Sequence, residues 1–273
     1  MQNSLTFPGD FQRHIKKGMS ILLLAFISFC CNQKEKARIE YNDLFFDNLK
    51  GNIEKVEESA YTLDATGKVT SPDSCCKSII HYDNRGYRII NSSVDIYGHE
   101  KNRQNYTSRF SNGIVKEIRF TENGRLTSIL AGSLNKNGGY GDTRIYDSSG
   151  KLVSYYADIL TNQFNKIIAM KEFKPDSTLQ QVIVNNYSKN IWVGGFVKDS
   201  SGKELLSTLI QLNEKSDPTE QVQIMLNNGL PDTTITRYAY DTYDDNNNWI
   251  QRTEMDDKKN IRKLIKRQIK YEQ

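Results

Sequence analysis

The sequence predicts an all-β protein: a long antiparallel meander of repeated hairpins that forms a twisted or curled sheet, preceded by a signal peptide and a short tether. One observation is a recurring turn pattern, in which acidic or polar turn residues and then Gly or Asn follow an aromatic residue. A second is the alternation of side chains beside these turns, as in Ile114 to Phe120. A third is that no convincing long helical period follows the leader.

Composition sets limits on the class of protein. The chain has 273 residues, of which 37% are hydrophobic and 26% charged, with a net charge of +4. The low hydrophobicity and high net charge that are typical of disorder are therefore absent. The composition favours a folded protein with a thin core rich in Tyr and Phe, and it does not suit a multi-span membrane protein.

The N-terminal segment has the pattern of an export signal. Basic residues between Arg13 and Lys17 precede an apolar run from Ile21 to Phe29. At about 1.5 Å per residue, this run is too short to cross roughly 30 Å of hydrocarbon. The pattern predicts a secretory signal peptide over residues 1–30, and a buried apolar strand is the alternative.

The run that ends in Cys30 and Cys31 resembles a bacterial lipoprotein signal. The small Cys30 precedes Cys31, whereas the bulky Phe29 precedes Cys30. We therefore predict lipid attachment at Cys31, with Cys30 as the alternative. The resemblance implies several acyl chains, which hold a protein firmly at a membrane because each buried CH₂ contributes about 0.8 kcal/mol.

The rest of the chain divides into a tether and a body. Residues 32–40 are polar and charged without apolar periodicity, which predicts a flexible tether over residues 31–48. A short helix over residues 43–49 is left open. Residues 49–273 are predicted to form a single β-repeat domain.

The turn pattern has a physical basis. Asp and Asn hydrogen-bond to their own backbone and tolerate positive φ, and Gly adopts positive φ without steric cost. Such residues close hairpins of two to five residues. Clear copies of the pattern lie over 81–89, 119–126 and 145–153, and weaker copies lie over 173–179, 197–203 and 243–249.

The last part of the chain is basic. Residues 252–270 hold eight Lys or Arg and three acids. Residues 261–271 fit a helix or a strand, and the β context favours a strand. We expect an edge strand whose lysines block unwanted pairing, and attraction of polyanions or phosphate-rich headgroups is the alternative.

Motif searches predict no catalytic residue, no metal site and no cofactor. His81 and His99 lie beside turns, and no zinc-type spacing of His or Cys occurs. A nucleophile elbow and a phosphate-binding loop are also missing from the sequence. Asp244 and Asn248 fall on a calcium-loop pattern, but Trp249 stands where the loop needs Gly, so a hairpin turn is favoured.

Aromatic residues are the candidates for ligand contact. Trp192, Trp249 and Tyr243 have side chains that stack on sugar rings, although aromatic residues beside hairpins also serve cross-strand packing. The adjacent Cys75 and Cys76 leave a vicinal disulfide, an intermolecular pair or buried thiols open.

The opening residues 49–56, the tyrosine–aspartate turns and the close over residues 237–271 together resemble a family. It is the group of uncharacterised lipoproteins with tyrosine–aspartate-type turns that is common in Bacteroidetes. The turns are more loosely similar to the YD repeats of Rhs-type proteins. Asn247 departs from the pattern, because Gly is usual there. The resemblance implies a location and an architecture, and it implies no reaction.

These observations lead to one main hypothesis. The protein is expected at the outer membrane of a Gram-negative cell envelope, facing the periplasm or the surface, as a binding or scaffold module held by its N-terminal lipid. Its partner would be an envelope protein or a glycan, bound at an exposed sheet face or edge, and not a nucleic acid. An accessory subunit of an outer-membrane complex and a glycan-processing enzyme are the alternatives, so enzymatic activity is left open and a non-enzymatic role is favoured.

Overall fold

The structure is a computed structural model that describes residues 42–64, 67–72, 77–188, 191–227 and 229–272. The predicted signal peptide, both candidate lipid sites (Cys30 and Cys31) and the adjacent Cys75 and Cys76 lie outside the described residues. The elements are α1 (Asp43–Phe46), β1 (Ile53–Leu63), β2 (Val69–Pro72), β3 (Lys77–Tyr82), β4 (Arg88–Val94), β5 (Glu100–Arg109), β6 (Val115–Glu122), β7 (Arg125–Leu134), β8 (Tyr140–Asp147), β9 (Leu152–Thr161), β10 (Ile167–Phe173), β11 (Leu179–Ser188), β12 (Ile191–Asp199), β13 (Glu204–Leu212), β14 (Pro218–Asn227), β15 (Leu230–Tyr243), β16 (Trp249–Met255) and β17 (Ile261–Tyr271).

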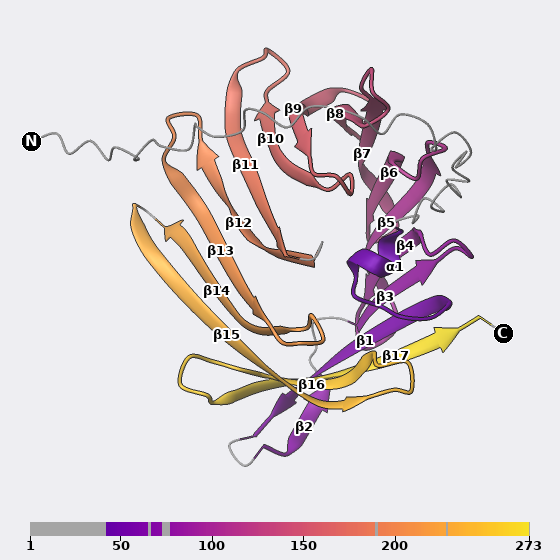
Figure 1. Ribbon diagram of the computed structural model, residues 1–273, viewed down its shortest axis with the longest axis vertical. Coiled ribbons are helices and arrows are strands. Elements are labelled where there is room, and N and C mark those ends of the chain that lie inside the picture. Colours follow the sequence, from indigo (N-terminus) through magenta and orange to yellow (C-terminus); the bar gives the residue numbers. More distant parts are fainter. Residues whose placement is uncertain (1–41, 65–66, 73–76, 189–190, 228, 273) are drawn as a thin grey trace, which may run out of the picture. The chain divides into compact units, whose positions relative to one another are not determined.

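The strands close into an antiparallel barrel (Figure 1). From β3 to β17 each strand pairs with the next along the chain, and β1 lies between the two ends of this series. Val56 of β1 has Ile80 of β3 as its partner on one side and Ile269 of β17 on the other. The short β2 pairs with the far end of β1, ahead of β3, so the ring has 16 strands. This confirms the all-β meander of hairpins and adds its closure.

The prediction that the basic C-terminal stretch forms an edge strand is wrong, because β17 pairs with both β16 and β1. Acidic residues of β1 lie opposite its basic residues. Arg267 donates to Glu58 at 2.9 and 2.5 Å, and the Lys270 ammonium lies 2.7 Å from the Glu54 carboxylate. Opposite charges on neighbouring strands stabilise their pairing. Arg267 and Lys270 therefore take part in barrel closure.

Nine of the described hairpin turns share one hydrogen-bond pattern. Between β8 and β9, the Asp147 N–H donates to the Lys151 carbonyl, and the Asp147 carboxylate accepts the N–H groups of Ser149 and Lys151. Gly150 has a φ of 84°, which Gly adopts without strain. The same pattern recurs at Asp83, Asp95, Asn135, Asn162, Asp199, Asn213, Asp244 and Asp256. The structure thus places Asp244 in a hairpin turn.

These turns predict an acid-dependent stability. The side-chain amide of Asn260 lowers the pKa of Asp256 to about 2, and the Ser149 and Ser201 hydroxyls lower the pKa of Asp147 and Asp199. A carboxylate with a lowered pKa contributes stability above its unfolded pKa of about 4, and this is lost as the pH falls through the folded pKa. We expect the melting temperature to drop between about pH 4 and pH 2.

A matched variant tests this pH dependence. Replacing Asp147, Asp199 and Asp256 by Asn keeps an acceptor oxygen in each turn, as the chain itself does at Asn135 and Asn162. The variant is expected to lose less of its melting temperature between pH 4 and pH 2, as measured by circular dichroism. An unchanged pH profile would contradict the assignment.

Pairing register separates an inner face of the barrel from an outer face. Val56, which is 2% exposed, packs with Leu44 and Leu49 of the segment before β1, and Ile80 and Ile269 pack against the same cluster. Register partners in a sheet share a face. The inner row that starts at Ile80 therefore continues through Asn91, Gln104, Phe120 and Ser128.

The outer face of the same strands mixes charged, polar and apolar side chains. Between the inner residues lie His81, Ile90, Asn105, Arg119 and Ile129, which are register partners on the outer face. On β1 the outer Glu57 forms ion pairs with Lys55 and Lys77, and these ammonium groups lower the pKa of Glu57. None of the helical segments in the described part of the chain has the length and apolar composition of a membrane-spanning helix.

Candidate functional site

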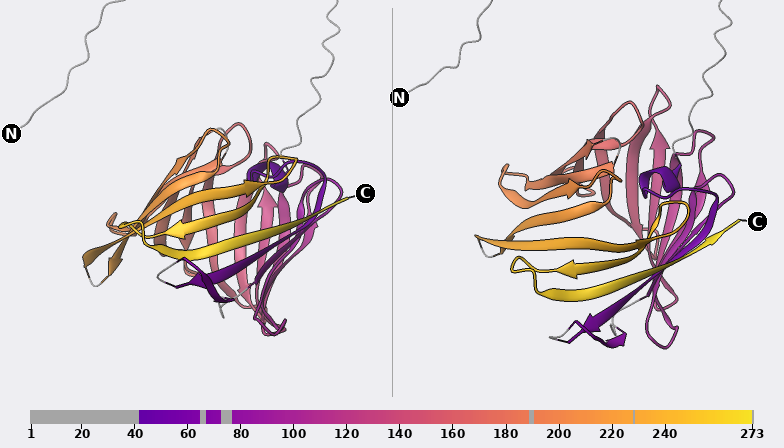
Figure 2. Two further views of the ribbon diagram at one scale, coloured as in Figure 1. Left: turned by 90° about the horizontal axis from the view of Figure 1, so that it is seen from below. Right: turned by 60° about the horizontal axis from the view of Figure 1, so that its bottom comes forward.

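Residues 42–50, here called the plug segment, lie across one end of the ring of strands (Figure 2). Asn42 caps α1, because its side-chain oxygen accepts the Phe45 N–H at 3.0 Å. Its amide also donates to the carbonyl of Arg85, in the turn between β3 and β4, at 2.7 Å. Leu44 and Leu49 are buried against Val56 and its neighbours. The plug segment is thus an integral part of the barrel.

Two carboxylates of the plug segment hold it to one wall. Asp43 accepts a hydrogen bond from Arg109 of β5 at 2.6 Å. Asp47 accepts from the Tyr82 hydroxyl at 2.6 Å and from Nε of Arg88 at 2.8 Å. Burial raises the pKa of Tyr82, and the charge of Asp47 raises it further. These groups form a hydrogen-bonded ionic cluster inside the mouth.

The end of the plug segment reaches the opposite wall. The Asn48 amide donates to Asp217 at 2.9 Å, in the turn between β13 and β14. Asn248, 2% exposed at the start of β16, exchanges two hydrogen bonds of 2.8 Å with the backbone of Lys50. Contacts with β3 to β5 on one side and with these later turns on the other show that the plug segment spans the mouth.

Lys166, in the turn between β9 and β10, contacts the plug segment from a third direction. Its ammonium lies 2.9 Å from the ring centroid of Phe46, which is a cation–π contact. Burial lowers the pKa of Lys166 to about 8, and the nearby Asp43 and Asp47 oppose this shift. The mouth therefore combines packing, ion pairs and an aromatic contact around one short segment.

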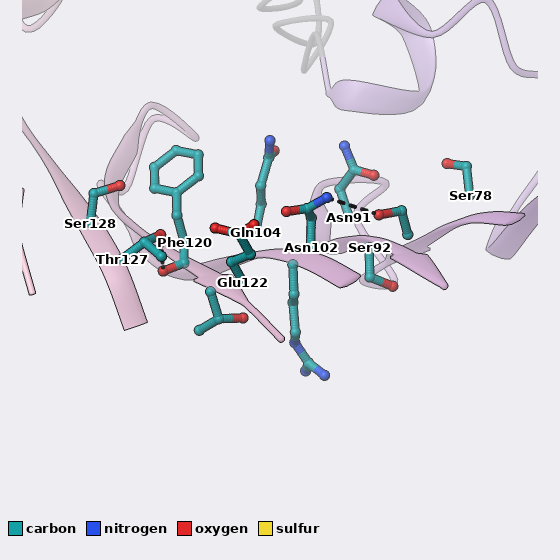
Figure 3. A pocket seen from close by; sticks show the side chains of 12 residues that line it. Ser78, Asn91, Ser92, Asn102, Gln104, Phe120, Glu122, Thr127 and Ser128 are labelled. Carbon is teal, nitrogen blue, oxygen red and sulfur yellow. Dashed lines mark hydrogen bonds between the residues drawn. The ribbon is translucent and has the colours of Figure 1, made fainter. Parts of the chain in front are cut away.

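Away from the plug segment, the wall formed by β3 to β7 lines a hollow of about 420 Å³. Figure 3 shows Asn91, Gln104 and Phe120 on one side of the sheet, and Ser92 on the other. The lining is Ser78, Asn91, Ser92, Ser93, Asn102, Arg103, Gln104, Phe120, Thr121, Glu122, Thr127 and Ser128. Most of these side chains are polar and uncharged, and Phe120 is the single aromatic one. Ser92, Arg103 and Thr121 belong to the outer face, and we take the inner-face members of the lining, here called the inner wall, as the candidate binding site.

Two of the predicted ligand contacts, Trp249 and Tyr243, lie side by side, but their rings pack against other side chains of the protein. Trp249 is 5% exposed, and the guanidinium of Arg267 lies 3.5 Å from its centroid. Tyr243 is the register partner of Trp249, and its hydroxyl donates to Asp217 at 2.9 Å. Both rings contact Tyr240. In this structure the pair packs within the protein near the plugged mouth.

Trp192 lies elsewhere, on β12. Its ring is 41% exposed, and its indole N–H donates to the side-chain oxygen of Asn185 at 3.1 Å. The three aromatic residues therefore do not form one surface. A role of any of them in ligand contact stays a prediction.

The two histidines also lie apart. His81 faces outward on β3, where burial lowers its pKa. His99 closes the turn between β4 and β5, and its Nδ1 lies 3.2 Å from the Asp95 carboxylate. Across the residues that the structure describes, no three His, Cys, Asp or Glu side chains come together as metal ligands.

Sequence reasoning missed the residues of the inner wall. Asn91, Asn102 and Gln104 sit within strands, where Asn is depleted because its amide competes with the backbone for hydrogen bonds. Amides at alternate positions of predicted strands were therefore the available signal. Without the register, however, nothing in the sequence joins Asn91 to Gln104 and Phe120.

The sequence matches no protein-family model and no curated protein sequence. Among solved structures, a porin-like protein from Bacteroides uniformis is 11% identical over 81% of this chain and 99% of its own, with a TM-score of 0.49. The Tc holotoxin pore of Photorhabdus luminescens is 11% identical over 78% of this chain, with a TM-score of 0.27, and this chain covers only 13% of its length. Such similarity establishes no shared function. The lipoprotein resemblance stays a prediction, because no family is assigned.

Proposed function

We propose that this protein is a lipid-anchored barrel of a bacterial cell envelope, at the outer membrane, which binds a ligand along its inner wall and catalyses no reaction. The observation that carries this proposal is the polar, largely uncharged lining of the hollow beside β3 to β7. A barrel of 16 strands encloses space that side chains do not fill, so the inner face is accessible to a ligand.

The charge of the outer face supports a barrel that lies outside the bilayer. A barrel within lipid presents an apolar band, and one Lys or Arg at the midplane costs about 2–4 kcal/mol. Here Arg119 and its partner Glu117 lie on β6, and Glu57 of β1 pairs with Lys55 of the same strand and Lys77 of β3. These charges on β1, β3 and β6 oppose insertion. The N-terminal lipid would then provide the attachment to the membrane.

A glycan-processing enzyme is less well supported by this hollow. Glycoside hydrolysis needs two carboxyl groups that face one glycosidic bond, about 5–10 Å apart. Among the lining residues only Glu122 is acidic. The inner wall therefore offers the means to bind a ligand without the pair that would cleave it.

An accessory role in a complex is the second candidate. Leu209 of β13 is 59% exposed, and Ile224 of β14, on the neighbouring strand, is 40% exposed. Leu209 points away from the buried Ile210, so it faces outward. Apolar side chains on an outer face are suited to contact with another envelope protein.

Metabolic labelling with a palmitate analogue tests the anchor. Label is expected in the wild type and in Cys30→Ala, and its loss is expected in Cys31→Ala. Protease treatment of intact cells then separates a surface-facing body, which is cleaved, from a periplasmic body, which is protected. Label retained in both variants would contradict lipid anchoring at this position.

A further inference from the structure

We propose that the inner wall of β4 to β7 is a subsite for a neutral oligosaccharide. This inference rests on the proposed function, in that it takes the inner wall as the binding surface. The subsite consists of Asn91, Asn102, Gln104, Phe120 and Ser128, which lie on one face of four neighbouring strands (Figure 3).

The polar side chains of the subsite have unused hydrogen-bonding groups. Among the described residues, Asn91 and Ser128 make no side-chain hydrogen bond. Gln104 accepts from the Tyr106 hydroxyl at 3.2 Å, which leaves its amide N–H groups available. Asn102 donates to Ser93 at 3.4 Å, which leaves its carbonyl oxygen available. Amides offer both donors and acceptors, and so do sugar hydroxyls.

Phe120 supplies a flat apolar surface within this polar wall. It lies between Gln104 and Ser128 in the inner row, and its ring is half-buried. A pyranose ring is apolar on the face where its axial C–H groups point, and its hydroxyls project around the edge. An aromatic face flanked by amides and hydroxyls matches both parts of such a ring.

The charge of the wall favours a neutral ligand. Arg103 borders the hollow, but its guanidinium donates to Asn105 at 2.8 Å on the outer row. Glu122 is the register partner of Asn102, so the nearest inner charge is negative. The inner-face cation in the register row of Ser78 is Arg267, which already donates to Glu58 at 2.9 and 2.5 Å, so a phosphate or sulfate group would have to compete with that carboxylate. An apolar ligand would leave the amides without partners, at a cost of about 1–3 kcal/mol for each buried group.

The lining of the hollow agrees with this class of ligand. Ligand pockets measure roughly 300–1,000 Å³, and most of them are lined by apolar side chains. The hollow of about 420 Å³ takes in Ser92, Arg103 and Thr121 of the outer face as well as the inner wall, and its lining is mainly hydroxyl and amide. The departure from an apolar lining is what points to a polyhydroxylated ligand.

The test is calorimetric binding to the full-length lipoprotein, purified in lauryldimethylamine oxide because glycosidic detergents would compete. The probes are maltohexaose, cellohexaose, xylohexaose and laminarihexaose, with polygalacturonate and a heparin hexasaccharide as anionic counterparts. We expect a neutral hexasaccharide to bind and no anionic one. We also expect Phe120→Ala and Asn91→Ala to weaken this binding at least tenfold.

Tyr146→Ala is the matched control, because Tyr146 is a half-buried aromatic residue on the outer row of β8. It should bind the hexasaccharide as the wild type does, and circular dichroism should show that all variants are folded. Binding of anionic sugars alone, failure of all four neutral probes, or equal binding by Phe120→Ala would overturn the proposal. Calorimetry tests the sugar subsite and palmitate labelling tests the lipid anchor, so either hypothesis can be contradicted without the other.

Discussion

Replacing Gly194 by Ala will lower the free energy of unfolding by about 3 kcal/mol or more. Gly194 lies within β12 at a φ of 124°, and a Cβ there would overlap the carbonyl oxygen of Thr208 on β13. Each strand of a closed barrel is paired on both sides, so β13 cannot move away without disturbing β14. Thermal unfolding followed by circular dichroism measures the loss.

Gly202 provides the matched control for this prediction. It also has a positive φ, 86°, but it lies in the turn between β12 and β13, and nothing lies within 4 Å of the position of its Cβ. Gly202→Ala should cost only about 1 kcal/mol, the energy of the left-handed conformation. If both variants unfold at the same temperature, the close contact between β12 and β13 does not exist as described.

Replacing Asp47 by Ala is expected to destabilise the protein by about 2–3 kcal/mol and to release the plug segment. The change removes the acceptor of the Tyr82 hydroxyl and the ion-pair partner of Arg88. The Arg88 side chain is 28% exposed, so its unpaired charge is only partly solvated. Breaking a buried pair costs about 3–5 kcal/mol, and this partial exposure lowers the cost.

Hydrogen exchange of residues 42–50 measures the release directly. Asp47→Ala should exchange these amides faster, while the amides of β11 to β13 stay protected. Glu117→Ala is the control, because the Glu117–Arg119 pair is more exposed, at 31% and 52%, and should contribute less than about 1 kcal/mol. Unchanged exchange in Asp47→Ala would show that the ionic cluster does not hold the plug segment.

The turns were predictable from sequence because they are local. Asp147 supplies the hydrogen bonds of its turn, and Gly150, three residues later, supplies the positive φ. Closure was not predictable in this way. β1 and β17 meet across more than 200 residues, and the complementary charges of Glu58 and Arg267 become informative only once the two strands are known to be neighbours.

The candidate site could not be predicted from the sequence for a related reason. Alternation of apolar and polar residues identifies a buried face, but the inner face of this barrel is itself partly polar, so both faces of β5 look alike in the sequence. The sequence also favoured Trp249 by residue type, whereas packing with Tyr240 and Arg267 buries it. The alternation from Ile114 to Phe120 predicts a strand but does not mark Phe120 as a ligand contact, although it is the aromatic residue that lines the hollow.

The location of the barrel is tested most directly by asking whether its outer face contacts water or lipid. The strand register places Arg119, Lys171 and Lys266 on the outer face. The lipoprotein, with Cys75 and Cys76 replaced by Ser, receives a single Cys at one of these positions, and the vesicles that carry it are treated with a membrane-impermeant maleimide. We predict that all three positions react as fast as a Cys at Gly98, whose Cβ position in the turn between β4 and β5 has nothing within 4 Å. Protection of the three positions until detergent is added would contradict a barrel outside the bilayer and place it within the lipid.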